Sequence, residues 1–217
     1  MQKLATLVFL SGTIALLSIN ASAIVKDRNK KAAATTAVVK ARATTFQVDA
    51  RQSKLSWVGK KVSGEHSGTI NISNGALTVE NSQLSGGNFS LDTRSIAVTD
   101  IKDADSNAKL LGHLKSDDFF SVEKFPKADF VITSLKAKGS GTYDVTGNLT
   151  IKGITNPVTF PATVTVNGKQ LTAKANIAVD RTKYNIKYGS KSFFEGIGDK
   201  AIYDNFDLNV ELVASAK

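Results

Sequence analysis

Cysteine is absent from this sequence of 217 residues, and histidine occurs only at His66 and His113. Without cysteine the chain has no disulfides, thiolate zinc sites, cysteine-ligated iron–sulfur clusters, cysteine nucleophiles or lipid anchors on cysteine. A Ser-His-Asp centre or an imidazole metal site would have to use one of the two histidines. The composition therefore excludes much redox and metal chemistry before any motif is considered.

Common enzyme motifs are absent as well. The sequence has no Gly-x-Ser-x-Gly elbow, no Gly-x-Gly-x-x-Gly fingerprint, no Walker loop and no His-Glu-x-x-His pair. One alternative stays open: His66 and His113, with nearby carboxylates, could form the metal site of a hydrolase or isomerase. The competing interpretation is that these histidines are hydrogen-bonded loop residues that bind no metal. Asp117 and Asp118 are adjacent and point apart on any regular element, which favours a role as cap or turn residues.

The positive charge of the chain is unevenly distributed. Of the net charge of +9, most lies in residues 1–45, which hold seven basic residues and one acidic residue. Residues 46–217 are nearly balanced, with 21 basic and 18 acidic residues. Nucleic-acid binding needs basic residues clustered with exposed aromatic side chains. The lysines at 60–61 and 183–191 are better explained as a solvated strand face, so we expect no nucleic-acid partner.

Residues 1–23 have the three parts of a secretory signal. Lys3 supplies the positive start, residues 4–19 the apolar run, and Ala21-Ser22-Ala23 a small-residue cleavage site. The apolar run of 16 residues is short for a membrane span of about 20 residues, which argues against an uncleaved anchor. We therefore expect an exported protein whose signal peptide is cleaved near Ala23.

Residues 24–44 are rich in lysine, arginine, alanine and threonine and have no periodic apolar face. Such a segment has little with which to offset the entropy cost of ordering, so we predict a flexible tether. Two interpretations of its charge remain open. It is either a solvated linker or a segment attracted to an anionic membrane surface, at about 1 kcal/mol per basic residue.

Residues 45–217 show the alternation of apolar and polar residues that is typical of half-buried strands. The clearest run is Phe206, Leu208, Val210 and Leu212, which alternate with polar residues. Three reversals are predicted at Asn74-Gly75, Lys138–Gly141 and Asn167-Gly168, and the Asn-Gly pairs suit type I′ hairpins. These hairpins, with almost no helical sequence between them, predict an all-β domain with antiparallel strands.

Residues 100–120 depart from this pattern. Ala108, Leu111 and Leu114 recur near helical spacing, after the candidate caps Asp103, Asp105 and Ser106. We predict one short helix here that ends before Phe119. A single helix among eight or nine strands favours a sheet that closes on itself, because closure removes exposed edges. A barrel of about eight strands is either filled by its own side chains or holds one small ligand.

Four longer runs carry a resemblance to a known family. These are WVGKKVSGEHSGTINISNGAL, HLKSDDFFSVEKFPKADF, GNLTIKGITNPVTFP, and VDRTKYNIKYG followed by GIGDKAIYDNFDLNVEL. Over residues 45–214 the chain resembles the YceI-like family of exported, lipocalin-like proteins. The resemblance implies a closed eight-stranded antiparallel lipocalin-like barrel in the periplasm. It also implies an apolar cavity that holds a polyisoprenoid, such as an isoprenoid quinone or prenyl lipid.

The resemblance favours binding over turnover and requires no cofactor other than the lipid ligand. We expect the chain to shield an apolar lipid from water, and the sequence leaves open whether two barrels pair. Filling of the barrel by phenylalanine side chains, of which the whole chain has eleven, is the competing structural interpretation. His113 and Arg181 are predicted to lie near a lipid headgroup or in a structural network, as is His66. The predicted ligand-binding residues are Trp57, Phe89, Leu91, His113, Leu114, Phe119, Phe120, Phe130, Ile132, Leu149, Arg181, Tyr184, Ile186, Phe193 and Phe194.

Overall fold

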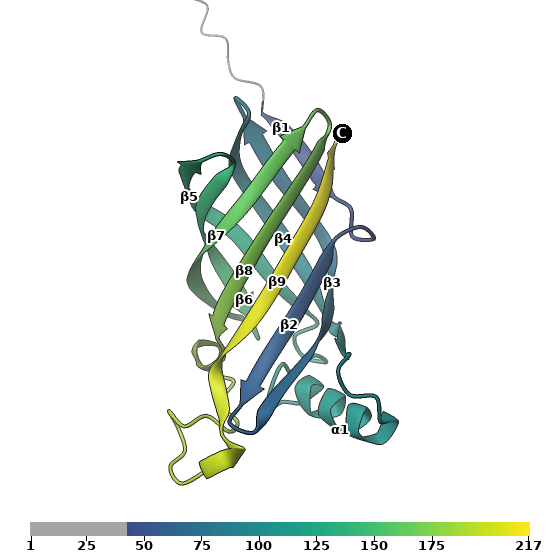
Figure 1. The fold of residues 1–217 in the computed structure, drawn as a ribbon, viewed down its shortest axis with the longest axis vertical. Helices are drawn as coiled ribbons and strands as arrows, with labels where there is room; N and C mark the ends of the chain where they lie inside the picture. The colour runs from purple at the N-terminus through teal and green to yellow at the C-terminus, as the bar shows by residue number, and fades with distance from the viewer. Residues whose placement is uncertain (1–42) are drawn as a thin grey trace, which may run out of the picture. The chain divides into compact units, whose positions relative to one another are not determined.

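A computed structural model describes residues 43–217, which form one barrel of antiparallel strands (Figure 1). The predicted signal peptide (1–23) and nearly all of the predicted tether (24–44) lie outside the described residues. The elements follow in the order β1 (Thr44–Val48), β2 (Lys54–Lys61), β3 (Gly64–Glu80), β4 (Gln83–Val98), α1 (Ala104–Lys115), β5 (Lys127–Gly139), β6 (Thr142–Ile151), β7 (Ile154–Asn167), β8 (Gln170–Asp180), the 3₁₀ turns η1 (Arg181–Tyr184) and η2 (Gly198–Lys200), and β9 (Ile202–Ala216).

The nine strands of the described residues occupy eight positions around the barrel. β1 pairs with β3 and β9 near one end of the barrel, and β2 pairs with the same two strands nearer the other end. The two short strands therefore share one position. The other seven strands follow in sequence order, and the pairing of β3 with β4 and of β8 with β9 completes the ring. The predicted closed eight-stranded antiparallel barrel is confirmed.

Two of the three predicted reversals are hairpins. β7 and β8 are joined at Asn167-Gly168, where Gly168 has a φ of 56° and Asn167 pairs with Gln170. Since Gly168 is the first residue of the two-residue loop, the turn fits type II′ better than the expected type I′. The Lys138–Gly141 segment reverses the chain between β5 and β6, with positive φ at Gly139, Ser140 and Gly141.

The predicted hairpin at Asn74-Gly75 is wrong. β3 runs without interruption from Gly64 to Glu80, and the register shifts between Ile72 and Asn74. Gly75 is required for close packing, because a Cβ there would lie 2.6 Å from Cδ1 of Phe89. The reversal lies at Asn81 and Ser82, which have φ values of 50° and 62°. Asparagine and glycine therefore mark a bulge here and not a turn.

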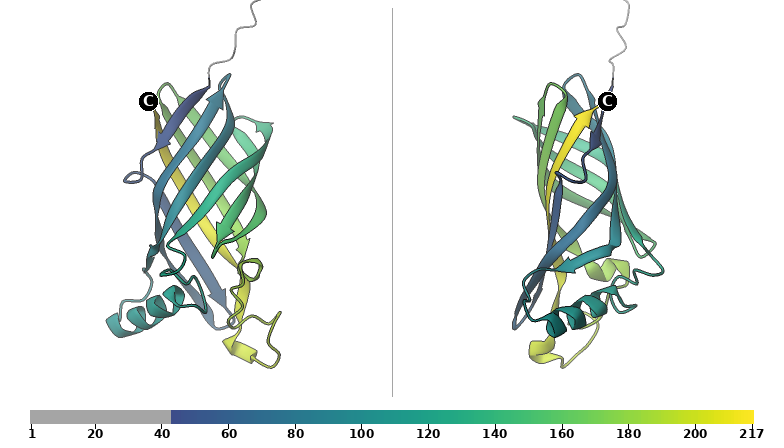
Figure 2. Two further views of the ribbon diagram at one scale, coloured as in Figure 1. Left: turned by 180° about the vertical axis from the view of Figure 1, so that it is seen from behind. Right: turned by 90° about the vertical axis from the view of Figure 1, so that its right-hand side faces the viewer.

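The predicted helix is confirmed as α1. Asp103 caps it, accepting a hydrogen bond from the Ser106 N–H at 2.9 Å, and Leu114 is the buried residue of the helix. α1 lies across one end of the barrel, beside the excursion that joins β8 to β9 (Figure 2). No helix among residues 43–217 has the length and hydropathy needed to span a bilayer.

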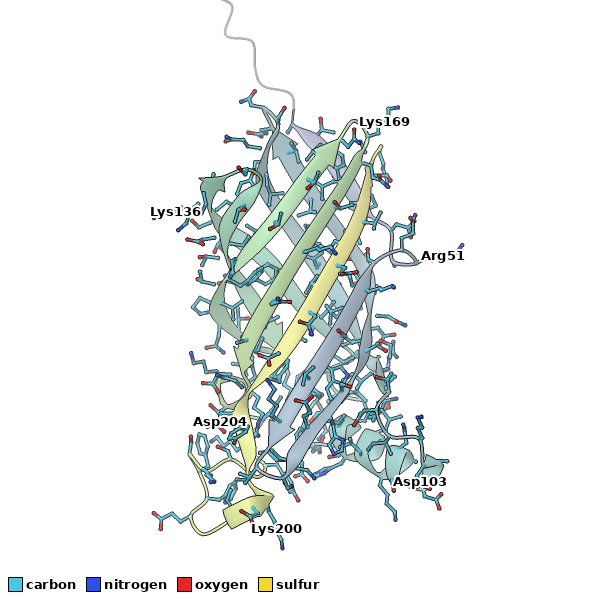
Figure 3. All side chains as sticks on the ribbon, viewed as in Figure 1. Arg51, Asp103, Lys136, Lys169, Lys200 and Asp204 are labelled. Atoms are coloured by element: carbon cyan, nitrogen blue, oxygen red, sulfur yellow. The ribbon has the colours of Figure 1, made fainter. Side chains whose placement is uncertain are left out.

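The two ends of the barrel are built differently. At the hairpin end, tight turns join β3 to β4, β5 to β6 and β7 to β8, and Phe46, Leu171 and Ala214 are buried there. At the lid end, two irregular segments cover the barrel: residues 99–126, which include α1, and residues 181–201. Figure 3 places Lys169 at the hairpin end and Asp103 and Lys200 at the lid end.

Candidate functional site

The half of the barrel towards the hairpin end encloses an apolar cavity of about 100 Å³. Among the described residues, no charged side-chain group reaches its wall, because the side chain of Lys174 is exposed and its Nζ pairs with Glu211 at 3.0 Å on the outer face. The wall is formed by alternate residues of the strands, as the period-two pattern requires. The lining residues are Leu55, Ile72, Leu77, Leu84, Phe89, Leu91, Phe130, Ile132, Val145, Leu149, Val158, Phe160, Ala162, Val164, Ala173, Lys174, Ala175, Ile177, Leu208, Val210 and Leu212.

A second cavity, of about 110 Å³, lies towards the lid end. Its wall differs from the first because it includes Thr93, Arg181, Tyr203 and Asn205 among the apolar residues. The lining residues are Trp57, Gly59, Ile70, Leu91, Thr93, Ile96, Leu114, Phe119, Phe120, Ala128, Leu149, Ile151, Arg181, Ile186, Ile202, Tyr203, Asn205, Phe206 and Leu208.

The two cavities follow one another along the barrel and meet at Leu91, Leu149 and Leu208, which line both. These leucines come from β4, β6 and β9. On β4, Phe89 precedes Leu91 in the hairpin-end cavity and Thr93 follows it in the lid-end cavity. The leucines therefore form a narrow layer between two chambers that together make an elongated apolar space.

Open apolar space of this size is costly to a folded protein. Cavities in protein cores cost about 24 cal/mol per Å³, so the two chambers together represent roughly 5 kcal/mol of packing that the chain does not make. This figure is comparable to the whole stability of a small domain, about 5–15 kcal/mol. An apolar molecule that fills the chambers restores these van der Waals contacts. Water does not, because the apolar walls offer it no hydrogen-bond partners.

Glycines allow the aromatic rings to lie against the wall of the barrel. A Cβ on Gly147 would lie 2.2 Å from Cζ of Phe130, and Gly75 leaves similar room for Phe89. The two rings stack with centroids 6.4 Å apart, and Phe130 also contacts Phe160 at 5.6 Å. The phenylalanines therefore leave open space in the barrel instead of filling it.

Trp57 lines the lid-end cavity and carries a hydrogen-bond donor that is unused. Its indole ring packs on Gly68, where a Cβ would lie 2.6 Å from Cζ2 of the ring. The Nε1 atom is buried and has no acceptor among the described residues. A buried donor without a partner costs about 1–3 kcal/mol. A ligand oxygen at this depth would supply the missing acceptor.

Arg181 holds the excursion between β8 and β9 against the barrel. Its side chain is 4% exposed, and it donates to the carbonyls of Tyr203 (3.0 Å), Ile186 (2.8 Å) and Ile202 (3.0 Å). Its charge faces Asp204, with an N–O distance of 3.7 Å. Burial lowers the pKa of Arg181, but a guanidinium remains charged at neutral pH. Arg181 is thus both a structural clamp and part of the lid-end cavity wall.

His113 joins the two covering segments outside the cavities. Its ring packs edge-on against Phe119 of its own segment (4.8 Å) and against Tyr188 of the other (4.5 Å). Its Nε2 lies 3.2 Å from Oδ2 of Asp118. The HLKSDDFF run therefore forms the end of α1 and the cover of the barrel, with Leu114, Phe119 and Phe120 reaching the lid-end cavity.

Residues 46–214 match the YceI-like domain, which covers most of the chain. This chain belongs to the YceI-like family. Curated relatives include UPF0312 proteins of Pseudomonas putida (strain F1) and Pseudomonas fluorescens (strain SBW25). They are 46% identical over 90 and 91 residues, which cover 38% of this chain and 47% of each relative. The chain thus matches about half the length of these relatives.

Solved structures share the YceI-like fold. Burkholderia cenocepacia BcnA superposes with a TM-score of 0.64 at 26% identity, covering 77% of this chain and 99% of BcnA. A polyisoprenoid binding domain from Saccharophagus degradans has a TM-score of 0.58 at 14% identity, covering 80% of this chain and 99% of that domain. At this identity the second likeness establishes the fold alone.

The YceI-like barrel brings most of the predicted site residues to the two cavities. The hairpin-end cavity is lined by Phe89, Phe130 and Ile132, and the shared layer contains Leu91 and Leu149. The lid-end cavity is lined by Trp57, Leu114, Phe119, Phe120, Arg181 and Ile186. The roles of these residues in ligand binding remain predictions.

Four predicted positions do not line either cavity. Phe193 and Phe194 are 48% and 50% exposed, so their placement in the cavity wall is corrected. Both follow Ser190 in an irregular loop, where their N–H groups donate to the Ser190 carbonyl. Tyr184, the last residue of η1, is buried, and burial raises its pKa to about 12. His113 lies on the outer side of the cover, as described above.

Sequence reasoning missed several lining residues of this YceI-like barrel. Leu208 is one of the three shared leucines, and Phe206 and Ile70 line the lid-end cavity. All three lie on strands with clear period-two alternation, so the register of those strands could have identified them. The alternation does not tell which inward residues face open space and which face another side chain.

The two histidines of the metal-site alternative belong to separate contacts. His66 on β3 lies with its Nδ1 2.8 Å from Oδ2 of Asp100, whereas His113 on α1 is near Asp118. Within residues 43–217, no group of three or more histidine, aspartate and glutamate side chains gathers as a metal-ligand set.

Proposed function

We propose that this protein binds one long apolar lipid, a polyisoprenoid such as an isoprenoid quinone or prenyl lipid, inside its barrel. The observation that carries the proposal is the pair of apolar cavities that meet at Leu91, Leu149 and Leu208. An elongated chain suits two chambers in line better than a compact molecule does. Each buried methylene contributes about 0.8 kcal/mol, so a chain of ten carbons supplies roughly 8 kcal/mol before ordering costs.

The lipid enters with its polar end towards the lid, in this proposal. The hairpin-end chamber offers no partner for a polar group among the described residues, whereas the lid-end chamber is lined by Trp57, whose buried indole N–H has no acceptor. A ligand with a carbonyl, hydroxyl or ester oxygen satisfies that donor. The oxygen therefore sets the direction of the chain, and the apolar walls supply most of the affinity.

We further propose that the protein acts in the periplasm as a binding protein and not as a catalyst. The sequence of residues 1–23 supports export, and membership of the YceI-like family supports lipid binding. Burying the chain in a dry cavity shields it from water, and no covalent step is needed. The proposal covers sequestration and carriage alike.

Native mass spectrometry of the protein, followed by organic extraction, tests the proposal. We expect a co-purifying lipid at a ratio of one per chain, with an oxygen-containing head and an apolar tail. Repeated purification of empty protein from a host rich in isoprenoid lipids would overturn the proposal. Trp57 is the only tryptophan, so its emission reports binding when geranylgeraniol is added to the delipidated protein.

Narrowing the leucine layer tests whether the lipid spans both chambers. In Leu149→Phe we expect binding of the C20 alcohol geranylgeraniol to weaken by at least about tenfold, while the C10 alcohol geraniol binds within about twofold of the wild type. Val131→Phe is the matched control, because Val131 is on β5 with its side chain exposed. If the binding of both alcohols weakens equally, or if neither weakens, the bound chain does not span the leucine layer.

A further inference from the structure

The excursion between β8 and β9 and the start of β9 carry aromatic side chains that are partly exposed to solvent. Tyr188, Phe193, Phe194 and Tyr203 are each about half exposed, and Val62 of the β2–β3 turn is 40% exposed. We call these five residues the aromatic patch. The other large apolar residues that are exposed among residues 43–217 lie elsewhere: Val131 is on β5, and Ile154 and Val166 are near opposite ends of β7.

Hydrogen bonds connect the segments that carry the aromatic patch. The Val62 N–H donates to the carbonyl of Ala201 at 3.0 Å, and the Ile202 N–H donates to the carbonyl of Gly189 at 2.8 Å. The N–H of Phe194 donates to the carbonyl of Ser190 at 3.0 Å. The side chains are therefore presented on a hydrogen-bonded scaffold, so ordering this surface on binding costs less entropy.

Exposed lysines surround the aromatic patch. Lys183, Lys187, Lys191 and Lys200 are all exposed, against the two acidic residues Glu195 and Asp199 in the same segment. The Nζ of Lys187 lies 4.6 Å from the centroid of the Phe193 ring, a cation–π contact. Figure 3 shows Lys200 on the part of this excursion that projects farthest from the barrel.

We propose that the aromatic patch and its lysines dock this protein on an anionic lipid bilayer, with the lid end facing the membrane. Aromatic residues favour the interface between water and lipid, and lysines are drawn to anionic headgroups. Exposed rings alternating with lysines fit a surface that is both apolar and negatively charged. Docking at this end brings the lid-end cavity to the membrane, where an apolar lipid is exchanged without crossing water.

The absence of cysteine makes a site-specific test possible. Phe194→Cys introduces a single thiol, to which the environment-sensitive dye NBD is attached in the full chain. On vesicles of 70% phosphatidylcholine and 30% phosphatidylglycerol, we expect at least a twofold rise and a blue shift of the dye emission. Pure phosphatidylcholine vesicles or 0.5 M NaCl should remove most of this response, because salt screens the lysines.

Val166→Cys is the matched control, since Val166 is exposed and lies near the β7–β8 turn at the hairpin end. We expect no change in its dye emission. A response at position 166 and none at position 194 overturns the proposal, because the barrel then docks by another face. No response at either position also overturns it, and leaves a protein partner as the occupant of the patch.

Charge and aromatic contributions are separated in unlabelled protein by vesicle co-sedimentation. Lys187→Gln and Lys191→Gln should each weaken partitioning by about fivefold, and Phe193→Ser with Phe194→Ser by about tenfold or more. Unchanged partitioning in both sets contradicts the docking surface. These variants should keep the response of Trp57 to geranylgeraniol, so failure of docking and failure of lipid binding are distinguishable.

Discussion

The hairpin end and the lid end of this barrel are closed by different means, although the same strands run between them. Tight turns and aliphatic packing close the hairpin end, and its cavity wall is apolar. Irregular chain closes the lid end, where the clamp of Arg181, the free N–H of Trp57 and the buried Tyr184 hydroxyl are found. Arg181 and Tyr184 are thus buried where the backbone leaves the ladder, whereas Trp57 lies within the ladder on β2.

The comparison teaches that the two ends differ in how firmly their backbone is held. A strand ladder satisfies most of its own backbone groups. At the hairpin end the buried Tyr143 hydroxyl pairs one more, accepting from the Leu84 N–H at 3.1 Å. The lid end depends on a few side-chain contacts, and segments held in this way open at lower free-energy cost than a ladder does. We therefore expect local opening to begin at the lid.

The largest effect is expected at the clamp of the lid end. Arg181→Met should lower the free energy of unfolding by about 3–5 kcal/mol, because it leaves three carbonyls and Asp204 without their partner. Arg181→Lys should recover only part of this, since an ammonium cannot match the guanidinium fork. Urea denaturation measures both. A loss below about 1 kcal/mol would show that water replaces the clamp.

The hairpin-end cavity is tested by a pair of glycine substitutions. Gly147→Ala should lower the free energy of unfolding by about 1–3 kcal/mol, because its Cβ would lie 2.2 Å from Phe130 and 2.6 Å from the Val131 carbonyl. Gly86→Ala is the control. Nothing lies within 4 Å of a Cβ at Gly86, so alanine should be neutral or stabilise by about 0.5 kcal/mol. Equal effects at the two sites would contradict rings held against the wall.

Tyr184→Phe should raise the free energy of unfolding by about 1 kcal/mol at pH 7, because the buried hydroxyl has no partner among the described residues. The folded pKa of about 12 lies above the ordinary value of 10.0, so the stability that the neutral form supplies is present below pH 10. It is lost as the pH rises towards 12, by up to about 1.4 kcal/mol per pH unit. Urea titrations between pH 9 and 12 should show this slope in the wild type and a shallower one in the variant.

The smallest effect is expected at Asp100, which ties the start of the lid to β3. Burial raises its pKa, but hydrogen bonds from the Ser67 N–H (3.0 Å) and His66 outweigh this, and the pKa lies below its usual range. Its contribution is present above about pH 4 and is lost as the pH falls through the lowered pKa. Asp100→Asn should cost less than about 1 kcal/mol at pH 7, and hydrogen exchange should increase mainly in residues 99–104. Faster exchange at the hairpin end instead would remove the contrast between the ends.

Local chemistry predicted much of the fold. The alternation of residues 206–212, the Asp103 cap and the Asn167-Gly168 hairpin each depend on neighbours in the sequence, and all three are present. The Asn74-Gly75 prediction failed for a tertiary reason, because the glycine makes room for Phe89 from the next strand. The same residue pair marks a turn or a bulge according to what lies opposite it.

The sequence by itself determined a closed antiparallel barrel with one capped helix, because strand alternation, turn residues and helix caps act over a few neighbouring positions. Only the tertiary structure decided that the barrel is hollow, that Leu91, Leu149 and Leu208 divide it, and that Phe193 and Phe194 face outward. Open space depends on how side chains from strands far apart in the sequence share one volume. The residues next to a given side chain in the sequence do not determine how that volume is shared.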